Sequence, residues 1–96
     1  MDDDFIEAVL GLVEQIPPGR VMSYGDIAEF LGRSGPRLVG AVMSRHGAAV
    51  PWWRVVRADG QPVRGLEERA LRHLRDDDTP LRGDRVDMAR ARYVPA

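Results

Sequence analysis

The 96-residue sequence contains no cysteine, no lysine and no long apolar run. Without cysteine there is no disulfide, no thiolate nucleophile and no cysteine-based zinc site. The two histidines, His46 and His73, stand apart in the sequence and make a poor metal set, so we predict neither a metal nor another cofactor. No apolar stretch approaches the roughly 18 residues of a membrane span, and the acidic start is unlike a signal peptide. We therefore expect a cytoplasmic protein with no membrane contact.

All 14 basic residues are arginine, and their distribution is uneven. Residues 20–64 hold seven arginines against Asp26, Glu29 and Asp59, a net charge of +4, although the whole chain has a formal charge of -1. A guanidinium can fork onto a phosphate or stack on a base, which favours a nucleic-acid contact surface in this segment. A GC-rich genome would produce the same arginine bias, and that explanation stays open.

Hydrophobic periodicity and capping residues predict a mainly α, winged-helix-like domain over residues 1–96, an architecture typical of DNA-binding domains. The expected helices span residues 4–16, 24–31, 36–46 and 67–74. Ser23 and Asp26 form a capping box before the second helix, and Ser34 is expected to cap the third. These two helices, joined by a glycine-bearing turn, outline a helix-turn-helix. A small β-hairpin is expected where Arg54–Arg57 runs into the turn at 58–60. The tail 81–96 is polar, with one short strand at 85–87, and is expected to be peripheral.

The segments 16–28, 37–43 and 51–56, followed by Asp59 and Gly60, resemble the DNA-binding domain of O6-alkylguanine-DNA alkyltransferases. The resemblance covers about residues 5–75. Active members read Pro-Cys-His-Arg-Val where this chain reads Pro-Trp-Trp-Arg-Val, so Trp52 stands at the nucleophilic cysteine and Trp53 at the activating histidine. An indole has no nucleophile of low pKa and offers only an N–H donor. The chain is therefore similar to the alkyltransferase-like proteins, which usually keep the histidine that Trp53 replaces here.

This resemblance implies a non-enzymatic DNA damage sensor. Such a protein binds O6-alkylguanine in double-stranded DNA by base flipping, through a helix-turn-helix in the minor groove, and flags the lesion for nucleotide excision repair proteins. We expect a monomer by default. Two alternatives stay open: a small helix-turn-helix transcriptional regulator that reads the major groove, and a decayed paralogue that acts as an interaction module.

The implied DNA-binding residues belong to the second and third helices. Tyr24 would press on the phosphate of the target nucleotide, and Arg37 would enter the duplex to fill the space left by the extruded base. Gly35, Gly40 and Ala41 would keep one face of the third helix low enough for the minor groove. The competing interpretations are a half-buried tyrosine, a solvated arginine and a glycine required for packing inside the protein.

The implied lesion pocket draws on four further residues. Trp52 would line it, Trp53 would pack beneath Trp52, and the backbone carbonyls of Trp52 and Val55 would accept hydrogen bonds from the guanine edge. Arg64 would stack on the flipped base. Paired tryptophans are equally expected as core residues. Arg54 is predicted to be structural, and the acidic run 76–78 is predicted to be a solvated helix end.

Overall fold

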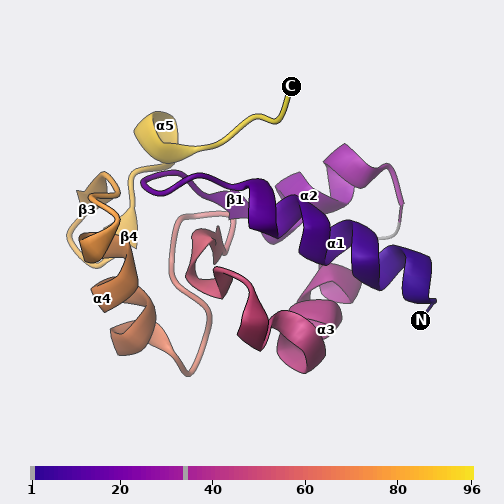
Figure 1. Cartoon of the computed structure of the whole chain (residues 1–96). Helices are drawn as coiled ribbons and strands as arrows, with labels where there is room; N and C mark the ends of the chain where they lie inside the picture. Colours follow the sequence, from indigo (N-terminus) through magenta and orange to yellow (C-terminus); the bar gives the residue numbers. More distant parts are fainter. Residues whose placement is uncertain (1, 34) are drawn as a thin grey trace.

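The computed structural model describes residues 2–33 and 35–96, and its N-terminal half is a group of three helices (Figure 1). These are α1 (Asp3–Gln15), α2 (Tyr24–Leu31) and α3 (Pro36–His46), close to the predicted bounds. Asp2 caps α1, where its Oδ1 accepts the N–H of Phe5 at 2.7 Å. The capping box at the start of α2 is confirmed, with Ser23 and Asp26 bonded reciprocally at 3.0 Å. The predicted cap Ser34 lies outside the described residues, and Gly35 is the N-cap of α3.

The remaining elements are short. They are β1 (Met22–Ser23), two 3-10 helices η1 (Gly47–Ala49) and η2 (Trp52–Arg54), β2 (Val55–Val56), α4 (Glu67–Asp76), β3 (Leu81–Arg82), β4 (Arg85–Val86) and α5 (Met88–Ala91). Within the described ranges, no helix combines the length and the apolar character needed to cross a bilayer.

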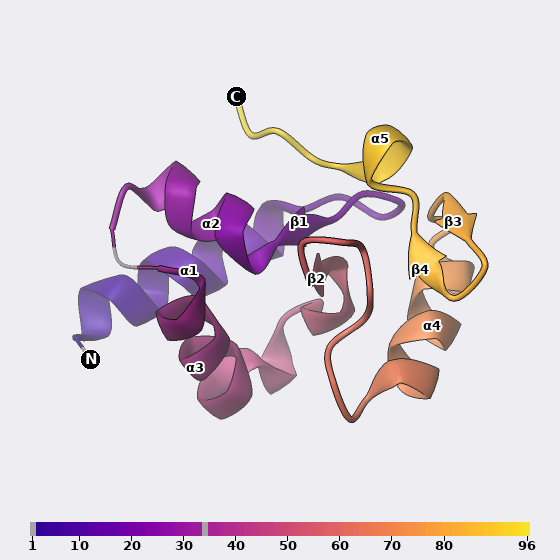
Figure 2. The same cartoon turned by 180° about the vertical axis from the view of Figure 1, so that it is seen from behind.

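The predicted hairpin after Arg54 is wrong in its place and its pairing. Strand β2 pairs in parallel with β1, with Met22 opposite Val55 and Ser23 opposite Val56 (Figure 2). The chain does turn at Gly60, whose N–H donates to the carbonyl of Arg57 at 2.8 Å. The antiparallel hairpin is instead β3 with β4, further along the chain. Parallel partners far apart in sequence leave no turn signal between them, which explains the error.

The β1–β2 pair separates two hydrophobic clusters. Alternate strand residues point to opposite faces, so Val55 packs with α1, α2 and α3 while its neighbour Val56 packs with α4 and the tail. The first cluster is the larger of the two, and most side chains in both clusters are almost fully buried. The small sheet therefore joins the group of α1, α2 and α3 to the group of α4 and the tail. Residues of both groups can thus lie around one site.

The tail is not peripheral. Val86 and Ala91 are buried in the second cluster, and Val21 exchanges backbone hydrogen bonds with the tail, donating to Ala91 at 2.9 Å and accepting from Tyr93 at 2.7 Å. The prediction failed because a few apolar residues among many charged ones do not produce a periodic pattern, yet they suffice to close a small cluster.

Candidate nucleic-acid interface

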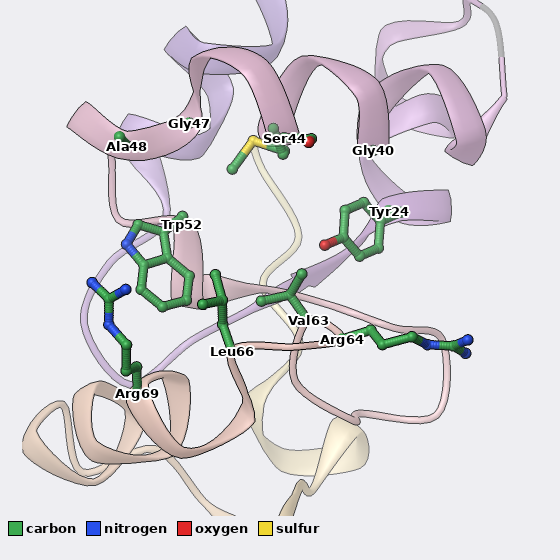
Figure 3. Close-up of a pocket in the computed structure, with 11 residues that line it drawn as sticks. Tyr24, Gly40, Ser44, Gly47, Ala48, Trp52, Val63, Arg64, Leu66 and Arg69 are labelled. Atoms are coloured by element: carbon green, nitrogen blue, oxygen red, sulfur yellow. The ribbon is translucent and has the colours of Figure 1, made fainter.

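A cavity of about 340 Å³ opens between α3 and the segment that leads into α4 (Figure 3). Its volume is at the lower end of cavities that hold small ligands. Figure 3 shows Tyr24 and Trp52 on opposite sides, with α3 and η1 above and Val63 and Leu66 below. The residues that line it are Tyr24, Gly40, Met43, Ser44, Gly47, Ala48, Trp52, Val63, Arg64, Leu66 and Arg69. Four predicted site residues from distant parts of the sequence thus share one cavity: Tyr24, Gly40, Trp52 and Arg64.

Tyr24 is held by the first turn of α2 and is half-buried against the first cluster. Burial raises the pKa of its phenol above the usual value, against a smaller opposing effect of Arg57. The hydroxyl therefore keeps its proton at neutral pH and can donate a hydrogen bond to an anionic oxygen. A phenol beside an arginine is a suitable contact for a phosphate group.

Glycines keep part of the exposed side of α3 free of side chains. A Cβ atom built on Gly35 or Gly40 would meet nothing within 4 Å, so neither glycine is required for packing inside the protein. Val39 and Val42 are buried on the opposite side, as predicted. Ala41 is half-buried, and Arg37 is exposed in the first turn. The helix thus presents small side chains behind one long cation, a shape that can approach a narrow groove closely.

Trp52 is a wall of the cavity and not a core residue. It is only half-buried, and its ring meets Trp53 edge to face, with 5.7 Å between centroids and an interplanar angle of 87°. His73 of α4 contacts it in a similar T-shaped arrangement at 5.7 Å. Edge-to-face contacts of this kind hold aromatic rings in fixed orientations. The indole therefore offers the cavity a well-positioned apolar face.

Trp53 packs behind Trp52, outside the cavity, and joins a polar network that the sequence did not predict. Its ring stacks on His73 at 3.9 Å, and its Nε1–H donates to Oδ2 of Asp77 at 2.9 Å. Arg54 donates two hydrogen bonds to the same carboxylate, from Nε at 2.8 Å and from Nη2 at 3.0 Å. Its Nη1 donates to the carbonyl of Ile16 at 3.1 Å. Arg54 is structural, as predicted.

Asp77 is consequently not part of a solvated helix end, which corrects the prediction for the run 76–78. Its side chain is 12% exposed, and that of Arg54 is 13% exposed. Burial alone would raise the pKa of Asp77, but the hydrogen bonds from Arg54 and Trp53 outweigh it and hold the pKa below its ordinary value. The sequence offered only an indirect signal in Arg54: a buried charge is normally paired, which indicates an acidic partner but does not identify it.

Val55 does not line the cavity. Its side chain is 1% exposed within the first cluster, so only its backbone could face a base. The carbonyl of Trp52 already accepts the N–H of Val55 inside the turn of η2. A carbonyl oxygen has two lone pairs, so this bond leaves room for one more donor.

Two arginines lie at the cavity, and the sequence indicated only one of them. In Figure 3 the side chain of Arg64 extends beneath Tyr24 and away from Trp52, whereas Arg69 stands beside the indole. The Cζ atom of Arg69 lies 5.7 Å from the centroid of the Trp52 ring. The sequence did not indicate Arg69 because it lies in α4, which has many charged residues. Its spacing does not distinguish it from the other arginines of that helix.

The residues 4–77 match the family model described as the DNA-binding domain of 6-O-methylguanine DNA methyltransferase. The chain belongs to this family. A bifunctional methyltransferase/endonuclease of Picrophilus torridus is 32% identical over 94% of the chain, which spans only 32% of that protein. A DNA base-flipping protein of Escherichia coli is 40% identical over 62% of the chain, which is 48% of that protein. The chain therefore spans well under two thirds of both relatives.

Solved structures of the family resemble the chain over its whole length. A crystal structure of S. pombe Atl1, in complex with damaged DNA containing O6-carboxymethylguanine, superimposes with a TM-score of 0.84 at 26% identity. It covers 99% of both chains. The predicted fold class, a mainly α DNA-binding domain, is thus confirmed, with small sheets in place of the hairpin predicted after Arg54.

Proposed function

We propose that this chain is a non-enzymatic DNA damage sensor, which binds O6-alkylguanine in double-stranded DNA and holds the flipped base in the cavity beside Trp52. One observation carries the proposal: an indole forms the cavity wall where active members of the family carry the nucleophilic cysteine. The side chain that would have to accept the alkyl group has no suitable nucleophile. Such a protein can bind the modified base but cannot remove the adduct.

The arrangement around the cavity supports base flipping. Extruding a base costs a few kcal/mol of stacking and pairing, so a flipping protein must fill the gap and hold the rotated nucleotide. Arg37 is exposed at the start of α3, where it can enter the duplex, and Tyr24 faces the cavity, where it can contact the phosphate. The name of the bacterial relative and the damaged DNA in the Atl1 complex support the same function.

A sensor without an alkyl acceptor leaves the lesion in place, so its product is a protein–DNA complex with a displaced base. We infer that nucleotide excision repair proteins act on this complex, since they remove the damaged strand rather than the adduct. A sequence reader of the major groove is less well supported, because α3 offers the small residues Gly40 and Ala41 where such a helix needs polar side chains.

The direct test is a titration of two duplexes that differ by a single O6-methyl group, at one fixed salt concentration. We expect the modified duplex to bind more tightly by on the order of tenfold, or about 1.4 kcal/mol. With a radiolabelled methyl group, the label is expected to stay on the DNA. Equal affinities would refute lesion sensing, and label on the protein would refute the non-enzymatic assignment. A preference for one undamaged sequence would favour the regulator.

Arg37→Ala is expected to weaken binding to the modified duplex by about 1 to 3 kcal/mol, the usual range for an arginine that contacts bases. It is also expected to reduce the signal of a fluorescent base analogue that reports flipping. Arg82→Ala removes another exposed arginine, from β3 far along the chain, and serves as the control for net charge. If both variants bind and flip alike, α3 does not enter the duplex as proposed.

A further inference from the structure

The charged side chains that line the cavity are all positive, although Glu67, next to the lining residue Leu66, interacts electrostatically with Arg64. Two of its lining residues are arginines, Arg64 and Arg69, and none is aspartate or glutamate. Within the described ranges 2–33 and 35–96, Arg69 takes part in no ion pair and donates no side-chain hydrogen bond. Its guanidinium lies over the ring of Trp52, with the Cζ atom 5.7 Å from the ring centroid. The five donors of its guanidinium therefore remain available to a ligand.

The position of Arg69 decides which part of a ligand it would meet. Figure 3 shows its guanidinium next to the indole of Trp52, at the end of the cavity opposite Tyr24. If Tyr24 contacts the phosphate of the extruded nucleotide, the base extends from there toward Trp52. The alkyl group, which projects from the far edge of the base, then lies against Trp52 and Leu66 with Arg69 beside it.

We propose that Arg69 makes the cavity selective for adducts that end in a carboxylate, so that anionic O6-alkyl groups bind more tightly than neutral groups of the same size. This inference rests on the proposed function. The methylene part of such an adduct would pack on the apolar faces of Trp52 and Leu66. The guanidinium fork matches the geometry of a carboxylate, and hydrogen bonds between charged partners are stronger than those between neutral ones. A cationic adduct would be repelled by the same group.

Arg64 is a weaker candidate for this role. Its side chain extends beneath Tyr24 and away from Trp52 in Figure 3, toward the region expected to hold the DNA backbone. An arginine there would raise affinity for every duplex, modified or not, because it would contact phosphate. Replacing Arg64 is therefore expected to weaken binding to every duplex, whereas replacing Arg69 is expected to weaken binding to the anionic adduct. The two effects can be measured separately.

The test uses four duplexes of one sequence, with guanine, O6-carboxymethylguanine, its neutral isostere O6-(carbamoylmethyl)guanine or the cationic O6-(2-aminoethyl)guanine at one position. At neutral pH and fixed salt, the wild-type protein is expected to prefer carboxymethyl over carbamoylmethyl by about fivefold to tenfold, and to bind aminoethyl least tightly of the three adducts. Lower salt is expected to widen the difference.

In Arg69→Gln the carboxymethyl and carbamoylmethyl duplexes are expected to bind equally, while both still bind more tightly than guanine. Arg72→Gln removes the same charge from the same helix at an exposed position outside the cavity, and is expected to keep the wild-type ratio. The inference is overturned if wild type does not distinguish the two isosteres, or if Arg64→Gln abolishes the ratio and Arg69→Gln does not. Equal binding of all four duplexes would overturn the proposed function as well.

Discussion

Gly60→Ala is expected to lower the free energy of unfolding by about 2 to 5 kcal/mol. The backbone at Gly60 has φ +88°, and a Cβ atom there would lie 2.3 Å from the carbonyl oxygen of Val86. A side chain at positive φ costs about 1 to 2 kcal/mol, and overpacking against immobile backbone adds about 1 to 3 kcal/mol. The neighbouring chain cannot move away easily, because the N–H of Val86 donates to the carbonyl of Gly60 at 2.9 Å.

A comparison of Gly60→Ala with Gly65→Ala by urea denaturation separates the cost of a side chain at positive φ from the cost of overpacking. Gly65 has almost the same φ, +90°, but a Cβ atom there would meet nothing within 4 Å. Gly65→Ala is therefore expected to show only the conformational cost. Equal losses in the two variants would mean that the contact between the turn and β4 does not contribute to stability.

Asp77→Ala is expected to cost about 3 to 5 kcal/mol of stability, since it leaves Arg54 buried without its charged partner. The matched control is Asp84→Ala, which removes an acid that is 85% exposed and 3.7 Å from Arg75. An exposed pair of this kind contributes about 1 kcal/mol or less. Chemical denaturation of both variants at neutral pH gives the comparison, and similar losses would contradict a structural role for the Asp77 network.

The pH dependence of this difference follows from the direction of the pKa shift. The pKa of Asp77 is lower in the folded protein than in the unfolded chain, where an aspartate has a pKa of about 3.9. The carboxylate therefore contributes its full stability above that value, and the contribution is lost as the pH falls through the folded pKa. The gap between wild type and Asp77→Ala is expected to be fully present at neutral pH and to narrow below about pH 4. A gap that instead grows in acid would contradict this assignment.

The helices could be predicted because their ends are determined locally. Asp2 and the Ser23–Asp26 capping box bind backbone groups within three residues, and Gly32 ends α2 with a left-handed φ of 65°. Each of these signals lies beside the element that it bounds. The pairing of β1 with β2 and the docking of the tail depend on residues far apart in sequence, so no local pattern could reveal them.

The cavity was predicted in part, for a similar reason. Tyr24, Gly40, Trp52 and Arg64 came from the resemblance to a family, and the structure brings all four to one cavity. Asp77 was missed because a single carboxylate in a run of three has no distinguishing pattern until Arg54 is seen to reach it. The family motif also indicates a histidine where Trp53 stands, so it could not predict the bond from the indole to Asp77.

Under the proposed function, the parallel pairing of β1 and β2 has a consequence for the speed of lesion capture. Tyr24 directly follows β1, and Trp52 begins η2, the short helix that leads directly into β2, so hydrogen-bonded strands in the core fix two opposite walls of the cavity. A cavity that exists in the free protein requires little rearrangement on binding. The time taken to form the complex is then set by the opening of the base pair. The ease with which a damaged base leaves the helix then determines the association rate. The fit of the base against Trp52 determines its residence time in the cavity.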